Sequence, residues 1–287
     1  MAFTLLTLGH GYTAQALALR LKPQGWRVFG TTRDATSSKI APASDVEVSV
    51  FPGGPLKVLD DATHLLISAG PDIDGDPMLR ALGPRIAERA SHLNWVGYLS
   101  TTGVYGDQNG DWVGEDAPLR PSTQRGQWRV AAEQAWQSIP GLPIHVFRLA
   151  GIYGPRRGPF AKLRRGTARR IIKPGQVFSR THVDDIAQVL EASIRQPNPG
   201  AAYNVCDDEP APPQDVIAAA AELLGMPVPP DIPIDQADMS PMARSFYSEN
   251  KRVKNNRIKE ELGVKLFYPD YRSGLRAILQ AEQGGQT

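Results

Sequence analysis

Short apolar runs alternate with amphipathic stretches along the first two-thirds of the chain. Each run is rich in β-branched, aromatic or leucine side chains, which is typical of a buried strand. Between several runs, residues 14–21, 78–90 and 124–139 carry apolar side chains at helical spacing. This alternation predicts crossover connections and a parallel sheet covered by helices on both faces. The predicted strands occupy residues 3–9, 26–32, 46–51, 64–70, 95–101, 144–150 and 201–206.

The pattern changes at residue 151, where proline and glycine clusters and a denser run of charges begin. A helical stripe in "THVDDIAQVLEASI" then leads back to the sheet, and helical patterns cover residues 212–225 and 268–279. We therefore predict an α/β fold, a Rossmann doubly wound parallel sheet with a smaller, mainly helical C-terminal substrate domain. The first domain comprises residues 1–150 plus about 181–206, and the second comprises 151–180 plus 207–287, so the two are interleaved.

A glycine turn, "LGHGYTA", joins the first predicted strand to the first helix. Gly9 and Gly11 leave backbone room for a pyrophosphate, and the free N–H groups of the helix start, at Tyr12 and Thr13, favour an anion. Ala14 stands at the third glycine position of the dinucleotide fingerprint, a replacement that the fingerprint allows. On the first strand of a parallel sheet, this turn predicts a dinucleotide site.

The second predicted strand ends in "TTRD", where an NAD site would usually place an acidic residue. The hydroxyl of Thr32 and the guanidinium of Arg33 instead suit a 2′-phosphate, so we predict NADP. Asp34 leaves NAD as the less favoured cofactor, and Arg33 as a merely solvated charge is the alternative. We also assign Ser68, Ala69 and Gly70, at the end of the predicted strand 64–70, to the cofactor site.

Composition narrows the functional classes. The 287 residues carry a net charge of +2, which gives no global field for nucleic acid. Cys206 is the one cysteine, so no internal disulfide forms, and without a cluster of metal-ligating residues we expect no metal site. The sequence shows neither a basic signal-peptide start nor an apolar run long enough to cross a membrane. We expect a cytoplasmic protein with no membrane partner.

Four segments in order, "YLSTTGVYG", "RLAGIYGPRR", "RTHVDDIA" and "AAYNVCDDEP", make the chain resemble the extended short-chain dehydrogenase/reductase family of sugar-nucleotide epimerases and dehydratases. The resemblance covers nearly the whole length. It implies a Rossmann domain that binds a nicotinamide cofactor and a C-terminal domain that holds the substrate, often a nucleotide sugar. It also implies a homodimer formed through helices 78–90 and 124–139.

The resemblance assigns a catalytic hydroxyl to Thr101. At the other two catalytic positions, the chain differs from the family. Where the family has a tyrosine followed four residues later by a lysine, this chain has Arg125 and Arg129. Arginine stays protonated, so Arg125 cannot act as a conventional general base. Arg129 can still supply the fixed charge that holds the nicotinamide ribose. The alternative is structural: Arg129 forms a surface pair with Glu133, and Arg125 is an ordinary helix-start residue.

Other residues can replace the missing tyrosine. Tyr105 and Tyr153 follow strand ends that we expect to face the cleft, where the resemblance has tyrosines that shape the substrate pocket. His182 titrates near neutrality, although its place before a helix also suits a capping role. All three are predicted to contact substrate.

Residues 151–180 hold nine basic residues and no acidic one. A run of this kind is either a solvated face, a nucleic-acid patch or the lining of an anionic substrate site. The resemblance places this segment at the substrate, so we favour the third use, with Arg156, Arg157 and Arg180 as ligands, and expect no nucleic acid. Two functions stay open: an atypical NADP-dependent epimerase, dehydratase or reductase, and a cofactor-binding sensor or scaffold that has lost catalysis.

Overall fold

The computed structural model describes residues 3–34, 46–52 and 56–284. Its centre is a seven-stranded sheet in the order β11-β7-β5-β4-β1-β2-β3, and all neighbouring strands are parallel. Each apolar run identified in the sequence forms one of these strands, so the predicted fold class is confirmed. Their bounds are Thr4–Leu8 (β1), Arg27–Thr32 (β2), Glu47–Val50 (β3), His64–Ile67 (β4), Trp95–Thr101 (β5), Ile144–Leu149 (β7) and Ala202–Val205 (β11).

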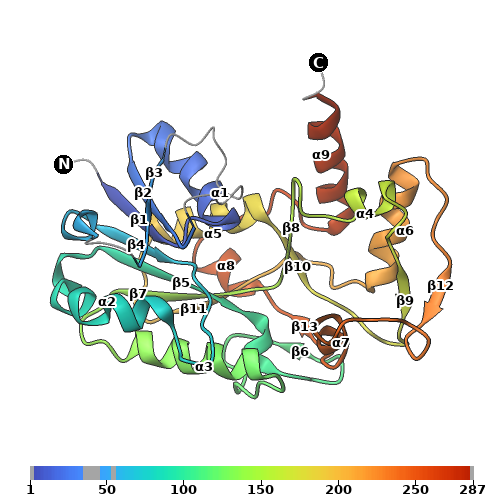
Figure 1. The fold of residues 1–287 in the computed structure, drawn as a ribbon, viewed down its shortest axis with the longest axis horizontal. Coiled ribbons are helices and arrows are strands. Elements are labelled where there is room, and N and C mark those ends of the chain that lie inside the picture. The colour runs from blue at the N-terminus through green and yellow to red at the C-terminus, as the bar shows by residue number, and fades with distance from the viewer. Residues whose placement is uncertain (1–2, 35–45, 53–55, 285–287) are drawn as a thin grey trace.

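Helices cover both faces of the sheet (Figure 1). On one face lie α1 (Tyr12–Leu21) and α5 (Val183–Arg195), and on the other lie α2 (Pro77–Glu88) and α3 (Gln124–Gln137). Successive strand residues point to opposite faces, so every strand of the sheet except β3 contributes to two hydrophobic clusters. In β1, for example, Leu5 packs with α1 and α5, whereas Leu6 and Leu8 pack with the α2 and α3 side.

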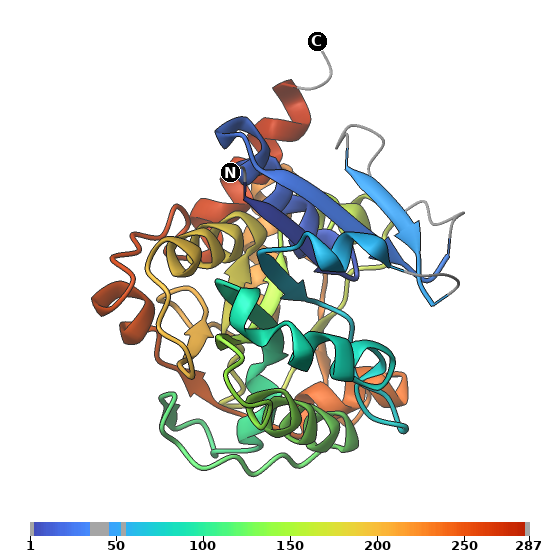
Figure 2. The same ribbon diagram turned by 90° about the vertical axis from the view of Figure 1, so that its left-hand side faces the viewer.

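The strand order reverses beside β1. The chain first runs outward to β2 and β3, which form one edge of the sheet (Figure 2), and then returns to build β4, β5, β7 and β11 on the other side of β1. A crevice opens at the carboxyl ends of parallel strands where such a reversal occurs. The fold therefore places the glycine turn after β1 next to the ends of β4 and β5.

A second group of elements stands beyond the carboxyl ends of these strands (Figure 1). Three of its helices bury a cluster of their own, which includes Phe160, Val216 and Tyr271. The predicted C-terminal helices are present, whereas the short strand pairs were not anticipated. The helices are α4 (Phe160–Arg164), α6 (Pro213–Leu223), α7 (Pro241–Tyr247) and α9 (Tyr271–Gly284), and the strand pairs are β8 (Gly151–Tyr153) with β10 (Arg180–His182), β9 (Arg170–Ile172) with β12 (Asp231–Pro233), and β6 (Trp112–Val113) with β13 (Arg252–Val253).

One short helix joins the sheet from far along the chain. α8 (Asn256–Glu260) places Ile258 in the cluster beneath α1 and α5, and Leu262 and Val264 follow it there. Each fully buried aliphatic side chain of this kind contributes about 1.5–3 kcal/mol to folding. Residues after 255 therefore stabilise the sheet domain as well as the substrate side.

Candidate functional site

The glycine turn holds the start of α1 open. Gly9 has a φ of 95°, a left-handed conformation that favours glycine, and its N–H donates to Thr31 Oγ1 at 2.8 Å. Gly11 is the N-cap residue; no side chain caps the helix and no acidic residue lies in its first turn. A Cβ built on Gly11 meets nothing within 4 Å. The first N–H groups of α1 therefore face an open space suited to an anion.

His10, the middle residue of the turn, packs against the sheet and supports the turn there. Its ring is buried, its Nδ1 lies 2.8 Å from Thr7 Oγ1, and a Cβ on Gly30 would approach its Cβ to 2.6 Å. Burial lowers the pKa of His10 to about 4, so this side chain is neutral at physiological pH. The glycine at position 30 is thus required by the close approach of His10, which fixes the turn against β2.

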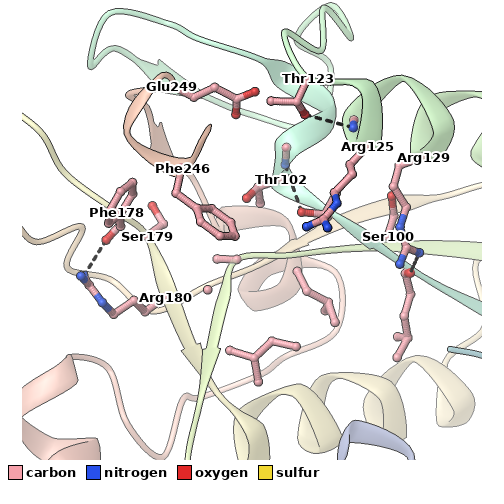
Figure 3. Close-up of a pocket in the computed structure, with 18 of the residues that line it drawn as sticks. Ser100, Thr102, Thr123, Arg125, Arg129, Phe178, Ser179, Arg180, Phe246 and Glu249 are labelled. Carbon is pink, nitrogen blue, oxygen red and sulfur yellow. Dashed lines mark hydrogen bonds between the residues drawn. The ribbon is translucent and has the colours of Figure 1, made fainter. Parts of the chain in front are cut away.

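A cavity of about 1090 Å³ extends from this turn across the strand ends. Gly11, Tyr12, Thr13 and Ser68 line it at the α1 end. The other walls come from the ends of β5 and β7, the start of α3, and α7 with the residues that follow it (Figure 3). β8 and the residues that lead into β10 complete the lining. We refer to this space as the main cavity.

Thr101 lies in the main cavity at the end of β5. Its side chain accepts a hydrogen bond from the Gly103 N–H at 3.2 Å and so caps the short 3₁₀ turn Thr102–Tyr105. The first turn of α3 packs closely on this turn, because a Cβ on Gly126 would lie 2.9 Å from the Gly103 carbonyl oxygen. This packing brings position 125 next to the β5 end.

The two arginines of α3 differ in their surroundings. Arg129 donates to the Leu99 carbonyl oxygen at 2.5 Å and to the Tyr98 hydroxyl at 3.1 Å. Its Nη2 also lies 3.0 Å from where a Cβ of Gly70 would stand. Arg125 is exposed, lines the main cavity beside Thr102 (Figure 3), and has no ion pair or side-chain hydrogen bond to any described residue. Arg125 is therefore free to bind an anion in the main cavity.

The surface pair between Arg129 and Glu133, which was the structural alternative, does not form. Glu133 is buried and pairs with Arg148 of β7, whose Nη2 lies 3.0 Å from its Oε2. Ser100 of β5 donates to the same carboxylate. The pair thus joins α3, β5 and β7 beneath the main cavity, where removal of one partner would leave an uncompensated buried charge.

Tyr105 does not face the cleft, contrary to our expectation. The 3₁₀ turn after β5 carries its ring into the core, where its hydroxyl donates to Asn204 Oδ1 at 2.7 Å and accepts from Arg148 Nη1 at 2.9 Å. Burial raises its pKa to about 12. Tyr105 therefore joins the strand ends in the core and does not line the main cavity, where substrate was expected.

The remaining cofactor residues surround the turn. Ala14 is fully buried in α1, and the N–H of Ala69 donates to the Leu8 carbonyl oxygen at 3.1 Å, so both shape the turn from inside. Thr32 is the last residue of β2 and Arg33 follows it, and neither lines the main cavity. Thr32 Oγ1 donates to the Asp34 carbonyl oxygen at 3.1 Å.

Of the predicted substrate residues, Tyr153, Arg157 and Arg180 line the main cavity. Burial raises the pKa of Tyr153, which disfavours its ionisation. His182 is buried, accepts a hydrogen bond from the Asp184 N–H at 3.2 Å and caps α5, as the capping alternative expected. It lines no cavity that we describe. Arg156 lines a smaller, neighbouring space instead.

Two groups of residues in the main cavity were not predicted from the sequence. Glu249 and Lys251 form an ion pair at 2.6 Å, both side chains being 11% exposed, and Ser122 Oγ donates to Glu249 Oε1. Lys251 Nζ also donates to the Gly106 carbonyl oxygen at 2.8 Å. Phe246 of α7 is 60% exposed within the same space (Figure 3). No local pattern marks these residues, because folding alone brings them to the strand ends.

Among the residues that the structure describes, no group of three or more His, Cys, Asp or Glu is arranged to hold a metal ion. The described helices also include none whose length and apolar character would let it cross a bilayer.

The fold and the position of the cavity define the class: the chain has the extended short-chain dehydrogenase/reductase fold of the NAD-dependent epimerases and dehydratases. A dTDP-glucose 4,6-dehydratase from Bacillus anthracis, solved in complex with NAD, superimposes with a TM-score of 0.78 at 16% identity over 99% of this chain and 98% of its own. No protein-family model matches the chain.

Two relatives are similar along nearly their whole length. A solved protein of Silicibacter pomeroyi, described as functionally unknown and conserved, is 63% identical, with a TM-score of 0.94 over 98% of this chain and 99% of its own. The chain therefore belongs to the same family as that protein. Protein YeeZ of Escherichia coli K12 is 28% identical over 92% of this chain and 95% of its own.

Proposed function

We propose that this protein is an NADP-dependent oxidoreductase of the epimerase, dehydratase or reductase type that acts on a small anionic substrate, such as a nucleotide sugar. The observation that carries the proposal is the continuity of the main cavity. It joins the open N-terminus of α1 to Thr101 and to the unpaired Arg125. The complex of the Bacillus anthracis dehydratase with NAD supports a nicotinamide dinucleotide at this turn.

The residues present fit such a cofactor. The uncapped start of α1 and the space over Gly11 suit the pyrophosphate. Arg129, which is fixed by Leu99 and Tyr98, takes the role of holding the nicotinamide ribose that the resemblance gives to the family lysine. Arg33 and Thr32 support a 2′-phosphate and so NADP over NAD. When bound, the nicotinamide supplies or accepts a hydride at a substrate carbon.

Residues of the chain must stabilise the negative charge that develops on the reacting oxygen and must supply its proton. The Thr101 hydroxyl hydrogen-bonds that oxygen, and Arg125 stabilises the negative charge that develops when the C=O electron pair moves to it. Arg125 keeps its proton, so the acid is assigned to Lys251, whose ammonium lines the same cavity and is oriented by Glu249.

A screen for hydride exchange tests this assignment. Purified protein is incubated with keto acids and nicotinamide-deuterated NADPH, and with nucleotide sugars and both NADP+ and the deuterated NADPH, so that a sugar can first be oxidised and its keto form then reduced. Deuterium in the recovered substrate is measured by mass spectrometry. We expect transfer to at least one compound, lost in Lys251→Met and retained in Lys259→Met, whose lysine pairs with Asp208 away from the cavity. Transfer that survives in Lys251→Met removes that residue from the mechanism.

The second candidate is a cofactor-binding sensor or scaffold, which is favoured by the arginine that stands in place of the family tyrosine. This function predicts tight NADPH binding without exchange on any substrate, also after Arg125→Tyr combined with Arg129→Lys. We further propose a homodimer formed through α2 and α3, for which light scattering after gel filtration would give twice the mass of 31.2 kDa.

A further inference from the structure

One aromatic side chain of the main cavity takes no part in the protein core. Phe246 of α7 is 60% exposed, more than any other aromatic residue that the structure describes, and it lines the cavity. Figure 3 shows its ring pointing into the space that Thr102 and Arg125 face from another side. An apolar ring that is left uncovered inside a cavity gains free energy when a ligand covers it.

Contacts around the end of α7 hold this ring near the start of α3. The helix buries none of its own residues, so packing of α7 does not explain its place. The carboxylate of Glu249, just past the helix, accepts a hydrogen bond from Ser122, which lies three residues before Arg125. The Tyr247 ring packs edge-on against Phe178, with ring centroids 5.5 Å apart. The end of α7 is therefore fixed as a wall of the cavity.

Apolar residues from the strand ends line the same cavity. Leu149 and Ala150 lie at the end of β7, Ile152 lies in β8, and Val177 shortly precedes β10. Together with Phe246, these side chains give the main cavity an apolar portion beside its cations. Ligand sites of this composition favour an apolar group whose orientation is set by a few polar contacts.

The polar side chains of the lining suit a sugar poorly. Among the described residues that line the main cavity there is no Asn, Gln, Asp or His, whose side chains could pair with several hydroxyl groups. Glu249, the one carboxylate, is already engaged by Lys251 and Ser122, and Ser100 donates to Glu133. A sugar ring covered here would leave hydroxyl groups without partners, whereas an aromatic ring has none to satisfy.

Arg125 complements such a ring with a charge. Its guanidinium presents several N–H donors in one plane and has no ion pair or side-chain hydrogen bond to any described residue. In a 2-keto acid, a carboxylate oxygen and the keto oxygen lie side by side, so one guanidinium can bind both. The hydroxyl of Thr101 lines the same cavity and can donate to the keto oxygen.

From the uncovered ring, the apolar lining and the unpaired cation, we propose that the substrate is an aryl keto acid or the corresponding hydroxy acid. This inference rests on the proposed function and narrows its substrate. The aromatic ring packs on Phe246, and the keto acid group lies at Arg125 and Thr101. In the reductive direction, the keto carbon receives a hydride from NADPH and its oxygen receives a proton, which leaves NADP+ and the hydroxy acid.

A nucleobase also presents a flat ring, so the source of the ring must be distinguished. In a nucleotide sugar, the base is separated from the reacting carbon by a diphosphate and a ribose. Phe246 instead shares the space of Arg125, where the reacting oxygen is assigned (Figure 3). This position favours a ring that is attached close to the reacting carbon.

Three ligands and three variants of α7 test the proposal. Isothermal titration calorimetry measures the binding of benzoylformate, of its saturated analogue cyclohexylglyoxylate and of uridine diphosphate. The titrations contain saturating NADP+, which cannot reduce a ketone. The variants are Phe246→Ala, Phe246→Tyr and Met242→Ala. Met242 is the matched control, because it is 51% exposed on the same helix and lies outside the lining.

We expect one benzoylformate per chain, bound about 2- to 12-fold more tightly than cyclohexylglyoxylate, because only the aromatic ring gains from packing on another ring. Phe246→Ala should weaken benzoylformate binding about tenfold or more, and Phe246→Tyr, which keeps the ring, should recover most of that loss. Met242→Ala should stay within about twofold of the wild type. Since both positions are exposed, thermal denaturation should give nearly the same Tm for all variants.

The inference is overturned if benzoylformate does not bind the wild type or binds no more tightly than cyclohexylglyoxylate. An equal loss of affinity in Met242→Ala and Phe246→Ala would overturn it as well. If uridine diphosphate binding depends on Phe246 and benzoylformate binding does not, the ring belongs to a nucleobase and the inference fails.

Reduction of benzoylformate, followed by the loss of NADPH absorbance, separates this inference from the proposed function. If benzoylformate binding depends on Phe246 but NADPH is not consumed, the proposed function fails and the aryl site stands. If hydride exchange occurs on a nucleotide sugar and benzoylformate does not bind, the proposed function stands and the inference fails.

Discussion

Gly11→Ala separates the cofactor site from the stability of the fold. Gly11 has a φ of −88°, which alanine adopts without strain, and a Cβ there meets no atom within 4 Å. Alanine is a poorer N-cap than glycine, so we expect a loss of about 0.5–1 kcal/mol in folding free energy, or roughly 2–4 °C in Tm. The methyl group, however, enters the space over the first N–H groups of α1, where the pyrophosphate would lie.

Overfilling a closely packed contact costs about 1–3 kcal/mol, so NADPH should bind about 5- to 150-fold more weakly to Gly11→Ala. The affinity is measured by NADPH fluorescence titration and the stability by thermal denaturation of the same preparation. Gly114→Ala is the control, since its Cβ also meets nothing within 4 Å and it lies far from the turn in sequence. Equal NADPH affinity in Gly11→Ala and the wild type would refute the placement of the pyrophosphate at α1.

Three further variants probe the cofactor choice, the buried ion pair and a buried carboxyl. Arg33→Ala should weaken the binding of NADPH about 10- to 100-fold and the binding of NADH less than twofold, because a charge-assisted contact to the 2′-phosphate is worth about 1.5–3 kcal/mol. Comparable losses of affinity for both cofactors in parallel titrations would contradict this. Arg148→Met should lower the free energy of unfolding in urea by about 3–5 kcal/mol, since Glu133 is left charged in the core, and adding Glu133→Gln should recover part of that loss. Burial raises the pKa of Asp207 to about 8. The protonated carboxyl therefore contributes fully to the free energy of unfolding below the ordinary carboxyl pKa, and this contribution is lost as the pH rises through about 8. Asp207→Asn should therefore raise Tm more at pH 9 than at pH 6, and an equal gain at both pH values would count against the raised pKa.

Most strands of the sheet were predictable because they are buried on both faces, although the edge strand β3 is largely exposed. A parallel strand covered on both sides reads as an uninterrupted apolar run, as in "HLLI" of β4, and a local pattern of this kind needs no tertiary information. The strand pairs outside the sheet have no such signal. Trp112–Val113 becomes a strand only because Arg252–Val253 lies beside it, and the two are separated by most of the chain's second half.

The site residues that follow a turn or a strand end could be predicted from the sequence. Those whose contacts depend on the direction of the side chain were harder to predict. The position of Arg125 next to the β5 end follows from α3 and the strand order. The spacing of Arg129 and Glu133 equally suits a surface pair, and only the adjacency of β5 and β7 shows that Glu133 serves Ser100 and Arg148. The pair of Glu249 and Lys251 comes from a segment with no periodic pattern, so its place in the cavity required the folded chain.

The central claim is that the glycine turn binds a nicotinamide dinucleotide with a 2′-phosphate. Isothermal titration of the wild-type protein with NADPH and, separately, with NADH tests it most directly. The account predicts one NADPH per chain, bound at least about tenfold more tightly than NADH because Arg33 contacts the extra phosphate. NADH binding as tight as NADPH would contradict the cofactor assignment, and no heat of binding with either dinucleotide at millimolar concentration would contradict the site itself.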